Sequence, residues 1–175
     1  GQFPELFAIP SNERKKEYLQ EGVIGKVLEV DIVKTYNIRK TNDFERLFWA
    51  LLPNTGQVIA SQNLGAELGI KRTTLFRYLS VLESALLATK IVNMSGSFRS
   101  SSRLLRKYYP GSSNFLSLVP QPLNIGFFVE TYIASLLQTR FSNVFLWRHR
   151  EKEVDFIIPE RSIGIEVKYQ EHIGK

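Results

Sequence analysis

The sequence predicts an α+β protein, with helices in its first half and strands towards its end. Three observations lead to this prediction. Apolar residues recur at helical spacing through residues 11–87, two strand-like runs flank a Ser/Gly turn within 86–109, and three short apolar runs follow in 144–169. With 43% hydrophobic residues in a chain of 175, the protein can fill packed cores.

Composition excludes several classes of protein. The chain has no cysteine, so it has no disulfides and no thiolate metal sites. It has no apolar run near the roughly 20 residues that span a bilayer, and its start has no signal-peptide pattern. We therefore expect a cytoplasmic protein without a membrane segment, and the sequence leaves its oligomeric state open. A first residue other than Met, and an end at Lys175 directly after a predicted strand, indicate a fragment of a longer protein.

Residues 11–37 have an apolar helical face and a plausible N-cap at Ser11 or Asn12. We expect two helices here, with a break near Gly22 or Gly25. Nothing in this segment points to chemistry.

A helix-turn-helix pattern follows. Residues 42–52 form an apolar helical stripe, and a short helix capped by Ser61 follows and is broken by Gly69. A longer helix covers residues 71–87. This order, a helix followed by a short helix, a Gly-containing turn and a basic helix, is typical of a helix-turn-helix. The two strand-like runs after it read as a β-wing, so residues 42–114 are predicted to be a winged helix.

Basic residues are concentrated in this unit. Residues 71–107 contain eight Lys or Arg against the single acid Glu83, whereas the rest of the chain has fifteen against sixteen acids. A localised basic stripe is typical of nucleic-acid binding. The predicted DNA contacts are Lys71, Arg72, Thr73, Thr74, Arg77, Arg99, Arg103, Arg106 and Lys107. A solvated surface or a protein-interaction spacer is the alternative.

The stretch "EVDFIIPERSIGIEVKY" (153–169) reads as a hairpin with a loop at 159–162. Pairing Ile158 with Ile163 sets Asp155 opposite Glu166 and Glu153 opposite Lys168, with Val154, Phe156 and Ile158 on the other face. Two directly opposed carboxylates destabilise a sheet unless a cation lies between them. Mg²⁺ is the natural candidate, because it prefers carboxylate oxygens, water and phosphate.

Helical periodicity places Glu130 in the buried stripe of a helix at 125–140. A buried carboxylate must meet a cation or be protonated. Packing this helix on the hairpin would bring Glu130 to Asp155 and Glu166. The alternative is that Lys168 pairs with Glu153 or Asp155 and that Glu130 bonds to Arg148 or the backbone. His149 and His172 are expected to be surface or structural residues.

This pattern resembles the PD-(D/E)xK core of restriction-endonuclease-like proteins. It consists of a Glu on a helix, then an Asp, then E-x-K on a hairpin. The resemblance implies Glu130, Asp155 and Glu166 as ligands of Mg²⁺ or Mn²⁺. It also implies a catalytic group of Asp155, Glu166 and Lys168, in which the lysine positions or activates the attacking water.

The order of the whole chain is similar to the C-terminal region of archaeal and bacterial AAA+ ATPases. The similar segments are "GQFPELF", "DIVKTYNI", "TTLFRYLSVLE", "WRHREKEVDFII" and "IGIEVK". The resemblance implies a helical segment at 1–41 continuing from an ATPase domain in cis, the winged helix at 42–114, and a truncated nuclease-like α/β module at 115–175. No Walker A sequence occurs, so we expect no ATP site in this chain.

The function expected from the sequence is DNA binding with Mg²⁺-dependent phosphodiester hydrolysis, as part of such an ATPase. The alternative is a catalytically silent DNA-binding or protein-interaction module that regulates the ATPase. Whether the chain is an enzyme stays open at this stage.

Overall fold

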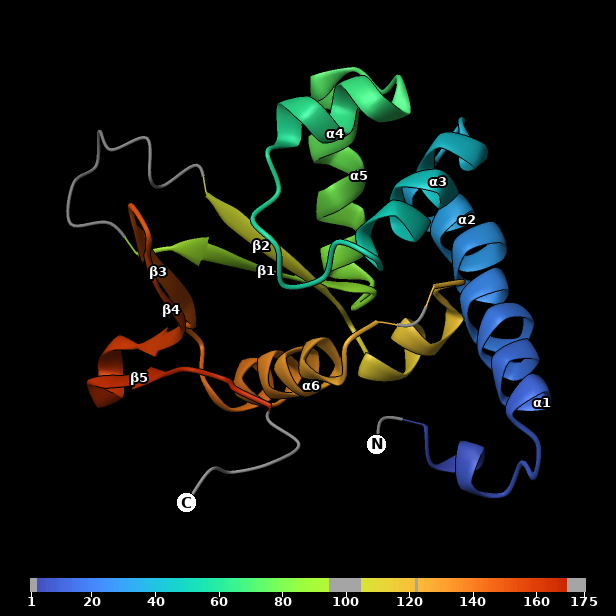
Figure 1. Ribbon diagram of the computed structural model, residues 1–175. Helices are drawn as coiled ribbons and strands as arrows, with labels where there is room; N and C mark the ends of the chain where they lie inside the picture. The colour runs from blue at the N-terminus through green and yellow to red at the C-terminus, as the bar shows by residue number, and fades with distance from the viewer. Residues whose placement is uncertain (1–2, 95–104, 122, 170–175) are drawn as a thin grey trace.

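The protein has the α+β architecture predicted from its sequence. A computed structural model describes residues 3–94, 105–121 and 123–169. Its first part is helical, and its described strands form one sheet in the order β2-β1-β3-β4-β5 (Figure 1).

The N-terminal part is dominated by one long helical segment. After a short turn, η1 (Pro4–Phe7), the segment runs through α1 (Asn12–Glu17), the π-helical stretch η2 (Tyr18–Asp31) and α2 (Ile32–Tyr36). The Ser11 hydroxyl accepts a hydrogen bond from the Arg14 N–H, which confirms the predicted cap. The break expected near Gly22 or Gly25 is wrong, because the helix passes through both and ends at Asn37, whose φ is 49° (Figure 1).

Three helices and a hairpin follow. The helices are α3 (Thr41–Leu51), α4 (Ser61–Leu68) and α5 (Arg72–Ser84), with Gly69 at φ +67° in the turn between the last two. Strands β1 (Ala88–Asn93) and β2 (Arg106–Pro110) pair antiparallel, from Ala88↔Pro110 to Val92↔Arg106. Val58, between α3 and α4, adds an isolated bridge to Lys107.

The remaining elements extend the same sheet. They are η4 (Ser113–Leu118), α6 (Ile125–Arg140), β3 (Phe145–His149), β4 (Lys152–Ile158), η5 (Pro159–Arg161) and β5 (Ile163–Ile165). Helix α6 has the bounds that its periodicity predicts, and Ile158 pairs with Ile163 as predicted for the hairpin. Because β1 runs parallel to β3, the sheet crosses the boundary predicted at residues 114–115.

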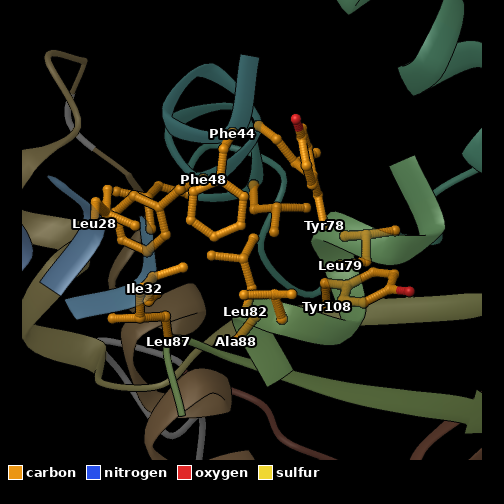
Figure 2. Close-up of a cluster of buried hydrophobic side chains, with 14 of the residues drawn as sticks. Leu28, Ile32, Phe44, Phe48, Tyr78, Leu79, Leu82, Leu87, Ala88 and Tyr108 are labelled. Carbon is orange, nitrogen blue, oxygen red and sulfur yellow. The ribbon is translucent and has the colours of Figure 1, made fainter. Parts of the chain in front are cut away.

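Two apolar cores lie on opposite sides of the β1–β2 hairpin. Figure 1 shows α5 on one side of this hairpin and α6 on the other. The larger core joins the long N-terminal helix, α3 and α5; in Figure 2, Phe44 and Tyr78 meet edge to face, with ring centroids 5.2 Å apart. The smaller core lies under α6 and includes Phe156. Alternation along β2 sends Tyr108 into the larger core and Tyr109 into the smaller one. Lys107 therefore points to the same side of the sheet as Tyr109.

Candidate functional site

A buried lysine surrounded by three carboxylates lies beside the smaller core. The Lys107 Nζ atom is 3.2 Å from Glu130 Oε1, 2.5 Å from Glu153 Oε1 and 3.2 Å from Asp155 Oδ1. Only 4% of the Lys107 side chain is exposed. We call these four residues the Lys107 cluster. It ties β2, α6 and β4 together.

A bulge in β4 explains how Asp155 reaches this position. Phe145 pairs with Ile157 and Trp147 with Val154, so the one residue between them in β3 lies opposite two in β4, Asp155 and Phe156. Such an extra residue interrupts the alternation of side chains. Asp155 binds Lys107, while its neighbour Phe156 packs on Tyr109 with ring centroids 5.9 Å apart.

The same bulge separates Asp155 from Glu166. Phe156 pairs with Ile165, which packs with Val167 against the smaller core. Alternation then directs Glu166 and Lys168 away from that core. The prediction that Phe156 and Ile158 lie on the face opposite Asp155 is therefore wrong, although the hairpin register is right. Asp155 Oδ2 instead accepts a hydrogen bond from the Val167 N–H, at 2.9 Å.

Glu130 is held by several groups at once. The Tyr109 hydroxyl donates to Glu130 Oε1 at 2.7 Å, in addition to the contact from Lys107. The backbone of Gly56 lies so close that an added Cβ would be 3.0 Å from the same oxygen. The next residue, Thr131, is fully buried and hydrogen-bonds to Thr55 at 2.9 Å. We expected a cation beside Glu130 because its carboxylate lies on a buried helical face. That cation is Lys107, and not Arg148.

The charges in the cluster shift the pKa of its members. Burial raises the pKa of the Glu130 carboxyl; Lys107 and Tyr109 oppose that rise, and Asp155 adds to it. Burial on its own would lower the pKa of Lys107, but the hydrogen bond to Glu153 and the nearby carboxylates raise it above its ordinary value. Burial, followed by the charge of Glu130, raises the pKa of Tyr109. Lys107 therefore stays charged and Tyr109 stays neutral at physiological pH.

The residues predicted as a metal site are not all brought together. Glu130 and Asp155 meet at Lys107, whereas Glu166 pairs with Lys168 at 3.0 Å, with 53% and 70% of their side chains exposed. Within the described ranges, no group of three or more acidic or histidine side chains is arranged to hold a metal ion. As placed, the Lys107 cluster does not fit Mg²⁺ or Mn²⁺, because an ammonium group already lies between its carboxylates.

The predicted DNA contacts fall into three groups. Lys71, Arg72 and Thr73 are exposed at the N-terminal end of α5, with Thr74 half-buried beside them. Arg77 is exposed, but its guanidinium donates to the carbonyls of Tyr36 (2.8 Å) and Asn37 (3.4 Å).

On β2, the Arg106 guanidinium lies over the Phe76 ring, 5.2 Å from its centroid. The prediction that Lys107 contacts DNA is wrong, because its side chain is buried among the carboxylates. Arg99 and Arg103, and His172 at the other end of the chain, lie outside the described residues. His149 stacks on Trp147, with ring centroids 6.4 Å apart.

Sequence reasoning missed the structural roles of Lys107, Tyr109, Glu153 and Gly56. One signal for Lys107 was available, since it lies two residues from Tyr109 in an apolar strand and so shares its face. Glu153 binds Lys107, and its Oε2 atom also lies 3.4 Å from Arg148 Nη1. Its partners are therefore Lys107 and Arg148, and not Lys168 as the hairpin register predicted. Nothing in the sequence indicates that Gly56, far from α6 in the chain, approaches Glu130.

Comparisons with known proteins identify a family for this chain but indicate no function. Among the described helices, none is long and apolar enough to cross a membrane. A search of the curated proteins gave no significant match, and neither did a search of the solved structures. The family model described as "Domain of unknown function (DUF8612)" matches residues 1–110, which is more than half of the chain. The chain therefore belongs to the DUF8612 family.

Proposed function

We propose that this chain is a winged-helix DNA-binding module whose nuclease-like part is a catalytically silent scaffold. The observation that carries the DNA-binding proposal is the exposed, basic N-terminal end of α5. Lys71, Arg72 and Thr73 are exposed there, and the first turn contains no acidic residue. The ATPase domain in cis stays a prediction from the sequence.

The arrangement around α5 supports this assignment. Helices α4 and α5 are joined by residues 69–71, with Gly69 in the left-handed conformation. The order of elements, with α3, the Val58 bridge, α4, α5 and the β1–β2 hairpin, supports a helix-turn-helix with a β-wing. No side chain caps the N-terminus of α5, so its free N–H groups and helix dipole add positive potential beside Lys71 and Arg72. Phosphate oxygens are the ligands that such a surface attracts.

The Lys107 cluster supports a silent nuclease-like part. Metal-dependent hydrolysis requires carboxylates free to bind the ion and a lysine near the attacking water. Here the carboxylates of Glu130 and Asp155 bind Lys107, and Lys168 is exposed and paired with Glu166. The cluster instead joins β2 to α6 and β4, which holds the wing strand in place. We therefore derive no hydrolytic step.

Salt-dependent DNA binding tests the proposal. Fluorescence anisotropy would follow the full chain on a short labelled duplex over a series of KCl concentrations. Lys71→Ala/Arg72→Ala should weaken binding and reduce the slope of log K against log [salt] by roughly 2, about 0.9 for each lost phosphate contact. The matched control, Lys16→Ala/Lys26→Ala, removes two exposed lysines from the N-terminal helical segment.

The control pair should leave the slope close to that of the wild type. Equal slopes in all three proteins, or no binding to duplex DNA, would contradict the proposal. That result would favour the protein-interaction alternative, because released counterions accompany phosphate contacts and protein contacts do not require them.

A further inference from the structure

A small pocket lies between α4, α5 and the start of β2. Its volume is about 260 Å³, and its walls include Val58, Ser61, Arg72, Phe76, Leu105 and Arg106. The pocket lies beside the basic end of α5, since Arg72 is the first residue of that helix. Typical pockets for drug-sized ligands measure roughly 300–1,000 Å³, so this one suits a single small ring system.

Two guanidinium groups lie close to one aromatic ring in this pocket. Arg72 Cζ is 5.7 Å from the centroid of the Phe76 ring, and Arg106 Cζ is 5.2 Å from it. The residues lining the pocket include no Asp or Glu. Neither arginine forms an ion pair with any residue that the structure describes, whereas Lys90 pairs with Glu83 at 2.6 Å. The pocket thus concentrates positive charge that the described protein does not neutralise.

Among the residues that the structure describes, one hydrogen-bond donor of Arg106 has no acceptor. Its Nε atom is buried, and no described residue accepts from it. A buried N–H group without an acceptor is costly, and an anion beside it would offset that cost. The uncapped N-terminus of α4, which begins at Ser61 on the pocket wall, adds further positive potential.

The rest of the lining is apolar. Val58, Leu105 and the Phe76 ring provide surface that prefers a flat, uncharged ring over water. Guanidinium planes and aromatic rings are also the groups on which unpaired bases stack. An apolar wall beside two cations fits a ligand that carries a planar ring and an anionic group together. A nucleotide has both.

We infer that this pocket binds one unpaired nucleotide, with its base against Val58, Phe76 and Leu105 and its phosphate at Arg72 and Arg106. This inference rests on the proposed DNA-binding function and specifies its substrate as DNA with an unpaired end or base. A free nucleoside monophosphate presents the same chemistry. The test therefore includes both sources.

Anisotropy competition on the full chain compares a blunt duplex with the same duplex bearing one unpaired 3′ nucleotide. The wild type should bind the overhang on the order of 10-fold more tightly, the effect of stacking one base. Ala60→Trp fills the pocket from an exposed position, and Phe76→Leu removes the ring but keeps an apolar side chain. Both variants should bring the ratio close to 1 and leave the affinity for the blunt duplex unchanged.

Lys71→Ala is the matched control, because this residue is exposed beside the pocket but does not line it. It should weaken binding of both duplexes by the same factor and preserve their ratio. Thymidine 5′-monophosphate is the second probe, and it should compete with the overhang in the wild type and not in Ala60→Trp.

Each outcome separates this inference from the proposed function. Equal affinities for overhang and blunt duplex in the wild type, with no competition by thymidine 5′-monophosphate, would overturn the pocket and leave duplex binding intact. A preference for the overhang that survives in Ala60→Trp would overturn it as well. Monophosphate binding lost in Ala60→Trp, without duplex binding, would support the pocket and refute the DNA-binding proposal.

Discussion

Lys107 on β2 and Asp155 on β4 are 48 residues apart in the sequence, yet Nζ and Oδ1 lie 3.2 Å from each other. Glu130 on α6 and Glu153 on β4 complete the contacts of the same ammonium group. The ammonium group of Lys107 binds all three carboxylates at the place where a metal ion would otherwise be expected. Stability, and not turnover, is the property that this cluster should control.

Replacing Lys107 tests that role. Lys107→Met leaves three largely buried carboxylates without their cation, so the free energy of unfolding should fall by about 3–5 kcal/mol. Urea denaturation followed by circular dichroism measures the change. Lys152→Met, at an exposed position of β4, is the control and should change stability by less than about 0.5 kcal/mol.

A rescue experiment keeps this prediction testable if Lys107→Met does not fold. Adding Glu153→Gln and Asp155→Asn to Lys107→Met removes two of the uncompensated charges and should recover part of the lost stability. A Lys107→Met protein as stable as the wild type would show that the ammonium does not neutralise these carboxylates.

Gly56 and Gly69 form a matched pair for testing the position of Glu130. Both have positive φ, so alanine at either position costs about 1–2 kcal/mol in the backbone. At Gly69 an added Cβ meets nothing within 4 Å, whereas at Gly56 it would lie 3.0 Å from Glu130 Oε1. Gly56→Ala should therefore lose about 1–3 kcal/mol more than Gly69→Ala in thermal or urea unfolding. Equal losses would mean that Glu130 does not approach this turn.

Glu130 should make stability fall as the pH rises above about 4.5, the ordinary pKa of its carboxyl. Burial raises the pKa of its carboxyl, so the folded state binds the proton more tightly than the unfolded state does. The contribution of Glu130 to the free energy of unfolding is then greatest at low pH. It falls, by at most about 1.4 kcal/mol per pH unit, as the pH rises from the unfolded pKa through the folded one.

Glu130→Gln lacks this titration and keeps the shape of the side chain. The difference in unfolding free energy, wild type minus variant, should become more positive as the pH is lowered from 7 to 4.5 in parallel urea titrations. A difference that becomes more negative over this range would mean that the folded-state pKa is lowered.

The local pattern of the sequence predicted much of the fold. Helix α6 begins and ends where its apolar spacing indicates, and the hairpin at 158–163 has the register that its loop length implies. Both features depend on neighbours within a few residues. The expected break near Gly22 was wrong because a helix of this length packs its apolar face along the larger core, which outweighs the intrinsic cost of glycine.

The site could be predicted only in part, because one extra residue in β4 changes which side chains share a face. Strict alternation in the sequence sets Asp155 beside Glu166, and the bulge opposite Leu146 separates them. Pairing of β1 with β3 is likewise invisible to local patterns, since it joins residues about 50 positions apart. The sequence could therefore predict that Glu130 needs a cation, but not that Lys107 supplies it.

Treatment of plasmid DNA tests the central proposal most directly. The full chain would be incubated with supercoiled plasmid and Mg²⁺ or Mn²⁺, beside Lys168→Ala, and each sample divided between a native gel and a deproteinised gel. We expect both proteins to retard the plasmid on the native gel and to leave it supercoiled after deproteinisation. Nicking or linearisation by the wild type that is lost in Lys168→Ala would contradict the account, and would show that the exposed Glu166–Lys168 pair belongs to a working metal-dependent nuclease.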